Sequence, residues 1–85
     1  KNMAYQLLVP KNEQKKLDKI SSHDRIRILT ACAILESDPY RGKQLQGKYK
    51  NEYAYRVWPY WIVYCIKKQD AAIVVICIGH FQSVN

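Results

Sequence analysis

The hydrophobic residues in the first half of the chain recur with the spacing of α-helices. In residues 23–37 they form two adjoining stripes, one at positions 26, 29 and 33 and the other at 28, 32 and 35. Two adjoining stripes predict a helix with a broad apolar face that packs closely on a sheet. The preceding segment, residues 11–20, carries Leu17 and Ile20 among charges. That pattern indicates a short helix with a narrow buried stripe.

Ser21 and Asp24 mark the start of the longer helix. A serine followed three residues later by an acidic residue can satisfy the free N–H groups of a first helical turn. Pro39 marks its end, because the residue before a proline is biased away from helical backbone.

Strand patterns occupy most of the remaining chain. "AYQLLVP" (4–10) is typical of a short first strand that ends at its proline. Three further strands are predicted by apolar and aromatic runs at 52–58, 60–68 and 71–79. The tight turn "QDA" joins the last two as an antiparallel hairpin, and Pro59 marks a bend between the first two.

This order of elements, β-α-α-β-β-β, predicts an α+β fold with a twisted, largely antiparallel sheet and both N-terminal helices on one face. We expect the 85 residues to form a single domain, 1–85. Residues 41–51 are rich in lysine, arginine and glycine, which predicts an exposed basic loop, with room for a short strand at 44–46. The longest apolar run, 71–79, is far short of the ~20 residues of a membrane helix, so no membrane partner is expected.

Side-chain alternation divides the strand at 60–68 into two faces. Tyr60, Ile62, Tyr64 and Ile66 share one face, and Trp61, Val63 and Cys65 share the other. We interpret Val63 and Cys65 as core positions. The tyrosines, whose hydroxyls need water or a partner, are then candidates for an open aromatic face.

The net charge of +7 narrows the classes of partner. A positive surface attracts nucleic acid, an acidic protein or an anionic membrane; a basic domain with no such partner is the alternative. The three cysteines lie in apolar segments without any Cys-x-x-Cys pair, which indicates reduced thiols in a cytoplasmic protein. No spacing of cysteine and histidine fits zinc, so neither a metal nor another cofactor is expected.

Aromatic residues interleaved with cations favour RNA, because bases stack on rings while cations hold phosphates. Our candidate RNA-binding residues are Lys43, Lys48, Lys50, Tyr60, Trp61 and Tyr64. Aromatic residues also favour strands for reasons of packing alone. His80, at the end of the last predicted strand, is a candidate acid, base or phosphate contact, or simply a polar strand end.

The segments "GKQLQGKYKNEYAYRVWPYWIVYCI" and "VVICIGHFQSVN" resemble the RelE/ParE superfamily of toxins from type II toxin–antitoxin systems. Members of that superfamily carry "RV" and "YRI" on successive strands and end the last strand with "GHR" and "VY". The resemblance is close over about half of the chain and rests on topology for the rest.

The resemblance implies a small basic toxin neutralised by a cognate antitoxin. The RelE branch cleaves mRNA in the ribosomal A site without a metal, whereas the ParE branch inhibits DNA gyrase. Arg56 matches the family's strand cation and His80 matches the histidine of "GHR", so these two are the implied catalytic residues. Lys48 and Lys50, in the basic loop just before Arg56, are implied RNA contacts.

Four positions depart from the RelE pattern: Ala54, Trp61, Phe81 and Asn85 stand where such enzymes have basic residues or a terminal tyrosine. Losing one donor that stabilises developing charge typically costs ~10²–10³ in rate. The leading hypothesis from the resemblance is therefore a toxin that acts as a ribosome-dependent mRNA endonuclease with substituted catalytic positions. The alternatives are a ParE-like inhibitor of gyrase and a member that only binds its antitoxin.

Overall fold

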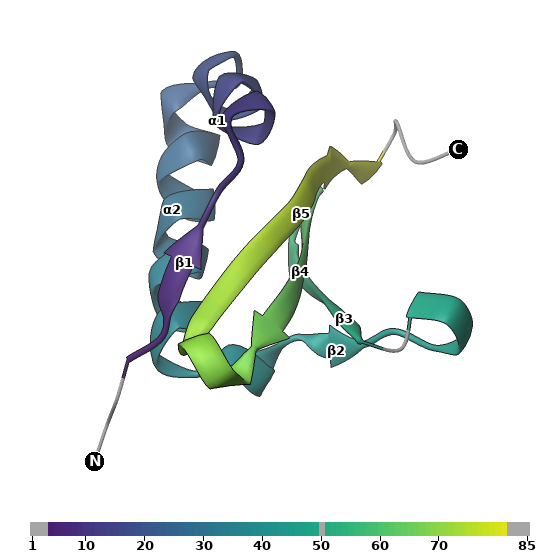
Figure 1. Ribbon diagram of the computed structural model, residues 1–85. Coiled ribbons are helices and arrows are strands. Elements are labelled where there is room, and N and C mark those ends of the chain that lie inside the picture. Colours follow the sequence, from purple (N-terminus) through teal and green to yellow (C-terminus); the bar gives the residue numbers. More distant parts are fainter. Residues whose placement is uncertain (1–3, 50, 82–85) are drawn as a thin grey trace.

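The computed structural model in Figure 1 describes residues 4–49 and 51–81. Its strands are β1 (Gln6–Leu8), β2 (Lys43–Gln44), β3 (Glu52–Val57), β4 (Tyr60–Lys67) and β5 (Ala72–His80). Its α-helices are α1 (Lys11–Asp18) and α2 (Ser22–Ser37), and its short 3₁₀ helices are η1 (Pro39–Arg41), η2 (Gly47–Tyr49) and η3 (Lys68–Asp70). The predicted order is confirmed, and the short strand expected at 44–46 lies at β2 instead.

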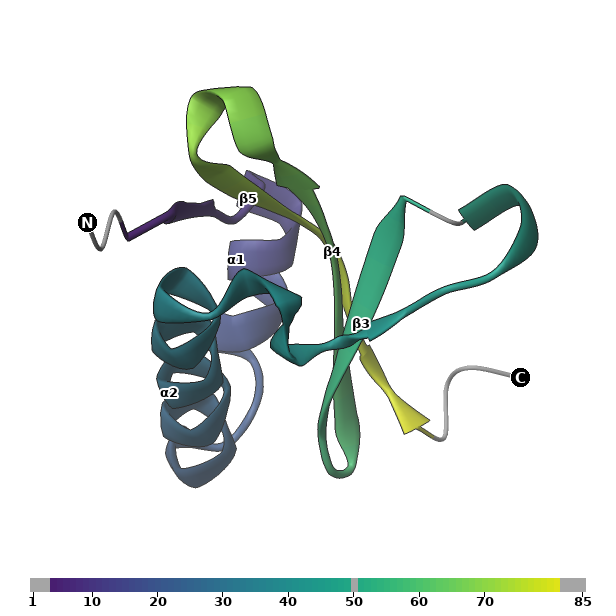
Figure 2. The ribbon, with the colours of Figure 1, turned by 90° about the horizontal axis from the view of Figure 1, so that it is seen from below.

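The strands form one sheet in the order β1-β5-β4-β3-β2. β1 runs parallel to β5, and the other neighbouring pairs are antiparallel. Both helices lie on the same side of this sheet, as Figures 1 and 2 show from two directions, so the predicted α+β fold is confirmed. None of the helices in the described part of the chain is long and apolar enough to cross a membrane.

Glu36, near the end of α2, holds β1 at the edge of the sheet. Its carboxylate Oε2 accepts a hydrogen bond from the N–H of Leu7 at 3.1 Å. Its carbonyl accepts one from the N–H of Tyr5 at 2.9 Å. A three-residue strand held in this way leaves no periodic pattern, which is why its pairing with β5 was not predicted.

α2 begins as predicted and packs more narrowly than predicted. The Ser21 hydroxyl accepts from the N–H of Asp24 at 3.2 Å. Ile28 and Leu35 are fully buried, whereas Ile26 is 62% exposed and Leu29 is 50% exposed. The broad apolar face was therefore a wrong prediction: α2 touches β1 and β3 along one stripe, while α1 covers β5.

The buried face of β4 is the opposite of the predicted one. Ile62 and Tyr64 are 0% exposed, while Val63 and Cys65 are half-buried on the face away from the helices. Alternation separates two faces but does not say which of them the helices cover. The helices cover the face of Ile62 and Tyr64, on which the Tyr64 hydroxyl has hydrogen-bond partners.

Tyr64 makes two hydrogen bonds inside the domain. Its hydroxyl donates to the carbonyl of Pro39 at 2.7 Å and accepts from the N–H of Gly42 at 3.1 Å. A Cβ on Gly42 would lie 2.5 Å from that hydroxyl, so the close approach requires a glycine. Burial raises the pKa of the Tyr64 hydroxyl above its ordinary value, and the residue joins η1 to the core.

A bulge in β5 decides which of its side chains face the helices. Tyr64 pairs with Val75, but Val63 pairs with Cys77, so Ile76 is an extra residue. Past the bulge, Ile78 takes the buried side, and His80, two residues on, shares it.

The backbone N–H of Ile78, just past the bulge, donates to the Glu13 carboxylate at 2.9 Å. Glu13 is 4% exposed and also pairs with Lys16 at 3.1 Å. Glu13→Ala leaves that buried N–H without its acceptor and is expected to lower the free energy of unfolding by about 1–3 kcal/mol. Glu13→Gln keeps an acceptor oxygen and is expected to lose less. Urea unfolding checks this, and equal losses for the two variants would contradict it.

The three cysteines are free thiols, as predicted; Cys32 is buried, and the other two are half-buried. Burial, assisted by the negative charge of Glu36, raises the pKa of the Cys32 thiol from 9.0 to about 11. Between these values the unfolded chain binds fewer protons than the folded one at this site. The contribution of Cys32 to stability is therefore present below pH 9.0 and is lost as the pH rises towards about 11.

Cys32→Ala removes this titration. Urea unfolding at pH 8 and pH 10 is expected to show a smaller alkaline loss of stability for the variant than for the natural chain. The same alkaline loss in both proteins would contradict the assignment.

Candidate functional site

Strand register places the candidate site residues on two different faces of the sheet. Arg56, Trp61 and Gly79 are cross-strand partners on β3, β4 and β5. They lie on the face away from the helices, which we call the outer face. Their neighbours along the strands, Tyr60 and His80, are paired with each other on the helix-covered side. The structure therefore does not bring the two predicted catalytic residues, Arg56 and His80, together.

Arg56 and Trp61 form a stacked pair on the outer face. The guanidinium carbon of Arg56 lies 4.9 Å from the centre of the Trp61 ring, a distance at which the cation and the ring attract each other. Arg56 is exposed and Trp61 is half-buried. The arrangement holds a positive charge over an aromatic ring in contact with solvent.

Two further aromatic residues lie at the end of the sheet near the β3–β4 turn. The centres of the Trp58 and Phe81 rings are 4.6 Å apart. Trp58 is 51% exposed and Phe81 is 49% exposed. Arg27 of α2 donates to the carbonyl of Trp58 at 2.8 Å. The N–H of Phe81 donates to the carbonyl of Pro59 at 2.7 Å, so both backbone segments are held in place.

Trp58, Phe81 and Gly79 were missed as site residues. Trp58 and Phe81 each lie one residue beyond the end of a strand, β3 and β5 respectively. Trp58 also lines a groove with Ile26 and Arg27 of α2, a contact that the local sequence does not reveal.

Lys43 lies beside the position where Ala54 replaces a basic residue. The two are register partners on β2 and β3, and Lys43 is exposed while Ala54 is buried. A cation from the edge strand β2 therefore lies next to Ala54, the position of β3 at which this chain has no basic residue.

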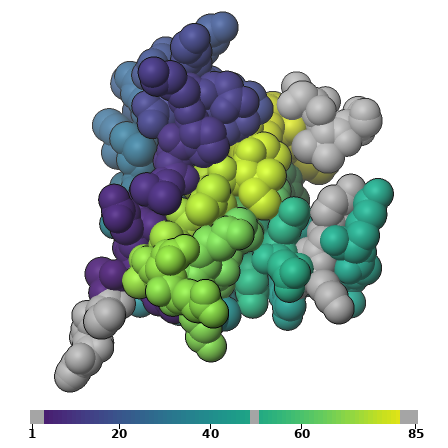
Figure 3. All heavy atoms as spheres, in the orientation of Figure 1, coloured from purple at the N-terminus to yellow at the C-terminus, as the bar shows by residue number. Residues whose placement is uncertain are grey.

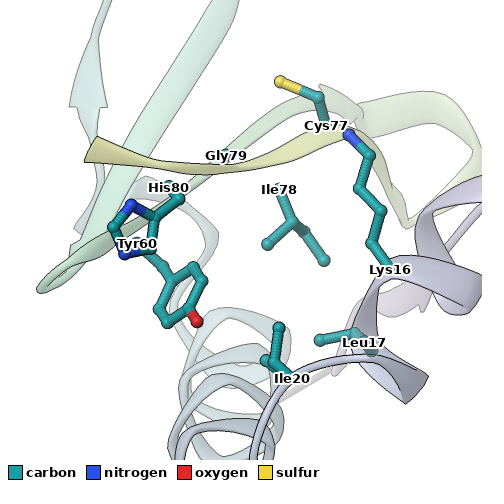
Figure 4. Close-up of a pocket in the computed structure, with 8 residues that line it drawn as sticks. All are labelled: Lys16, Leu17, Ile20, Tyr60, Cys77, Ile78, Gly79 and His80. Carbon is teal, nitrogen blue, oxygen red and sulfur yellow. The ribbon is translucent and has the colours of Figure 1, made fainter. Parts of the chain in front are cut away.

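His80 lines a groove between α1 and the end of β5, shown in Figure 4. Its ring meets the Tyr60 ring edge to face at 5.0 Å, and Lys16, Leu17 and Ile20 line the other side. The groove has a volume of about 400 Å³. Tyr60 and His80 are therefore partners in this groove and face away from Arg56.

The remaining predicted RNA-binding residues have different positions. Tyr64 is completely buried, so its ring cannot stack on a base, and that prediction is wrong. Lys48 is exposed on η2, which projects to the side opposite the helices (Figure 2). Lys50 and Asn85 lie outside the described residues. In residues 4–49 and 51–81, no cluster of three or more histidine, cysteine or acidic side chains could hold a metal.

Figure 3 shows how the two halves of the chain meet in one body. Helix α1 lies against the last strand, and the β2–η2 segment lies at the far side. The molecule is thus a two-helix layer on a mixed sheet whose outer face carries Arg56 and Trp61.

Comparisons with known proteins agree with this architecture. Residues 11–83 match the family described as the ParE toxin of the type II toxin–antitoxin system parDE. Among curated protein sequences, no significant match was found. The chain belongs to the RelE/ParE superfamily of type II toxins.

Solved structures share the fold at low sequence identity. The chain is similar to one in the RelBE2 toxin–antitoxin complex of Mycobacterium tuberculosis, with a TM-score of 0.82, 20% identity, and coverage of 92% of this chain and 99% of that one. It is also similar to one in the archaeal RelE–RelB complex of Pyrococcus horikoshii, with a TM-score of 0.82, 21% identity, and coverage of 96% of this chain and 100% of that one. For the isolated RelE toxin of E. coli the TM-score is 0.77 and the identity 22%, with 91% of this chain and 84% of that one covered.

Proposed function

We propose that this toxin acts on its cellular target by binding through the outer face and not by cleaving RNA, in the manner of the ParE branch, which inhibits DNA gyrase. One observation carries the proposal. Where the RelE pattern has cations, this chain has Ala54, Trp61 and Phe81. The remaining strand cation, Arg56, is stacked on Trp61.

Metal-free cleavage of RNA needs two things at one place: positive groups that stabilise the phosphorane, and an acceptor for the proton of the 2′-hydroxyl. Among the residues retained from the family pattern, His80 would be the acceptor of the 2′-hydroxyl proton, but its side chain lines the groove between α1 and β5. Each missing donor typically costs ~10²–10³ in rate. Binding through exposed aromatic rings and arginine needs no such constellation, because these side chains dominate the energetics of many interfaces.

Two assays with purified toxin test the proposal. We expect inhibition of DNA supercoiling by gyrase at micromolar toxin, and intact mRNA in a coupled translation reaction at the same concentration. Arg56→Ala is expected to weaken the inhibition. A-site cleavage products, with supercoiling unaffected, would contradict the proposal.

RelE-like cleavage of mRNA on the ribosome is the second candidate function. It is favoured by the exposed cations Arg56, Lys43 and Lys48 around the outer face, a set in which Lys43 compensates for Ala54. In that case Arg56→Ala and Lys43→Ala would each reduce the yield of cleaved mRNA. The second candidate fails if no dose of toxin yields cleaved mRNA.

We propose a cognate antitoxin as the protein partner, and the cytoplasm as the place where the two meet. The net charge of +7 favours an acidic segment. The exposed apolar side chains Ile26 and Leu29 on α2 offer such a segment a hydrophobic stripe. Size-exclusion chromatography with the product of the neighbouring open reading frame should show a complex, and no complex at micromolar concentration would contradict it.

A further inference from the structure

Helix α2 has a second row of side chains, on the side away from the sheet, that nothing in the domain covers. The row consists of Ile26, Leu29, Thr30 and Ala33, and all four are exposed. They recur at i, i+3, i+4 and i+7, which is the spacing of one helix face. We call these four residues the exposed stripe. Three of them are apolar, so α2 presents a face of the kind that helices bury against other helices.

The exposed stripe lies between two grooves. On one flank, a groove is lined by Leu29 together with Leu7 and Leu17. On the other flank, a groove is lined by Ile26 together with Trp58. Each groove has a volume of about 370 Å³, and α2 lies at the side of the molecule remote from β2 and η2 (Figures 1 and 2). A ridge flanked by grooves is the surface that packs against a second helix.

The exposed stripe is complementary to itself. Its centre lies between Leu29 and Thr30, which is also the midpoint of α2 (Ser22–Ser37). In an antiparallel pair of α2 helices related by a two-fold axis at this point, Ile26 of one copy lies opposite Ala33 of the other. Leu29 likewise lies opposite Thr30. Each larger side chain therefore meets a smaller one, as a two-fold interface between identical surfaces requires.

The charges beside the stripe favour the same antiparallel arrangement. Arg25 and Glu36 lie on one flank of α2, near its opposite ends. In the antiparallel pair, Arg25 of each copy lies within about one turn of Glu36 of the other, so opposite charges meet twice. Both side chains are held beside the stripe, because Arg25 donates to the Leu17 carbonyl at 3.1 Å and Glu36 accepts from the Leu7 N–H at 3.1 Å. The two helix dipoles also oppose each other.

We propose that, in the absence of its antitoxin, the toxin pairs with a second copy of itself through the exposed stripe, with the two α2 helices antiparallel. This goes beyond the proposed function and is independent of the cellular target. A single pair of helices makes a small interface, so the dimer dissociates in the micromolar range. The antitoxin is offered the same stripe in the proposed complex, and the two occupants therefore exclude each other.

Sedimentation velocity of the isolated toxin tests the pairing. Two copies with a net charge of +7 repel each other, so the measurement is made at about 0.3 M salt, which screens exposed charges. From micromolar to millimolar concentration, the natural chain is expected to change from monomer to dimer, and no larger species is expected because a two-fold interface is closed.

Ala33→Arg and Gln69→Arg form the matched pair of variants. Each adds one positive charge at an exposed position, the first on the stripe and the second on η3. Ala33→Arg is expected to weaken the dimer by about tenfold or more, because an arginine would be buried against Ile26 of the other copy. Gln69→Arg is expected to dimerise as the natural chain does. Circular dichroism and thermal unfolding show whether both variants are folded.

Engineered cysteines test the antiparallel direction under mild oxidation, with the natural chain and its three cysteines as the baseline. Position 30 lies next to the two-fold axis, so Thr30→Cys is expected to give a disulfide-linked dimer. The two copies of position 22 lie about 22 Å apart along the helices, beyond the ~7 Å reach of a disulfide. Ser22→Cys is therefore expected to stay at the baseline, whereas parallel helices would link both variants.

A natural chain that remains monomeric up to millimolar concentration would overturn the proposal. So would an Ala33→Arg variant that dimerises as tightly as Gln69→Arg, or a Ser22→Cys variant that links as readily as Thr30→Cys. Binding of the antitoxin by the linked Thr30→Cys dimer would contradict the shared stripe. None of these measurements involves gyrase or mRNA, so failure of the pairing and failure of the proposed function are distinguishable.

Discussion

Tyr64→Ala is expected to lower the free energy of unfolding by about 3–5 kcal/mol, because it removes a fully buried aromatic ring. It also removes the acceptor of the Gly42 N–H and the donor to the Pro39 carbonyl. A domain of this length typically has about 4–13 kcal/mol in total, so this single substitution removes a large part of the stability. Urea unfolding monitored by tryptophan fluorescence measures the loss.

Tyr64→Phe separates the hydroxyl from the ring. It keeps the packing and leaves two buried backbone groups without partners, so a loss of about 1–3 kcal/mol is expected. Gly42→Ala is also expected to destabilise, since its Cβ would lie 2.5 Å from the Tyr64 hydroxyl. Combining the two should cost less than the sum, because the phenylalanine removes the nearest of the atoms that the methyl group meets, although the Ala54 carbonyl oxygen at 2.9 Å remains. Simple additivity of the two losses would contradict this contact.

Ile28→Ala is expected to destabilise the domain by about 2–5 kcal/mol. Ile28 is 0% exposed on the buried stripe of α2, and its removal leaves a cavity between the helix and the sheet. The matched control is Ile26→Ala, in the same helix and with the same change of side chain. Ile26 is 62% exposed, so a change within about 0.5 kcal/mol is expected.

The two isoleucine variants also report on the use of the exposed stripe. Ile26→Ala is expected to weaken the complex with the antitoxin while leaving the stability of the toxin unchanged. Similar destabilisation by both substitutions, measured by urea unfolding, would mean that α2 buries the broad face predicted from its sequence.

Much of the fold could be predicted because its signals are local. The cap at Ser21, the hairpin turn at 69–71 and the strand bend at Pro59 each depend on a few adjacent residues. The burial of Tyr64 could not be predicted, because its two hydrogen-bond partners lie in η1 and just after it, more than twenty residues away. A tyrosine that is satisfied by distant backbone looks, in the sequence, like one that faces solvent.

The candidate site was harder to predict than the fold. The cross-strand contact of Arg56 with Trp61 depends on the register of β3 with β4. The position of His80 depends on the bulge at Ile76, which reverses the alternation of β5 past that point. A single extra residue therefore separates the two predicted catalytic side chains onto opposite faces of the sheet.

The integrity of cellular mRNA at the moment of growth arrest tests the central claim most directly. The toxin would be expressed without its antitoxin, and primer extension on abundant mRNAs would be run when growth stops. Binding through an aromatic outer face predicts arrested growth with full-length mRNA, and loss of arrest in Trp61→Ala. Codon-periodic cleavage of mRNA in the arrested cells would contradict the claim.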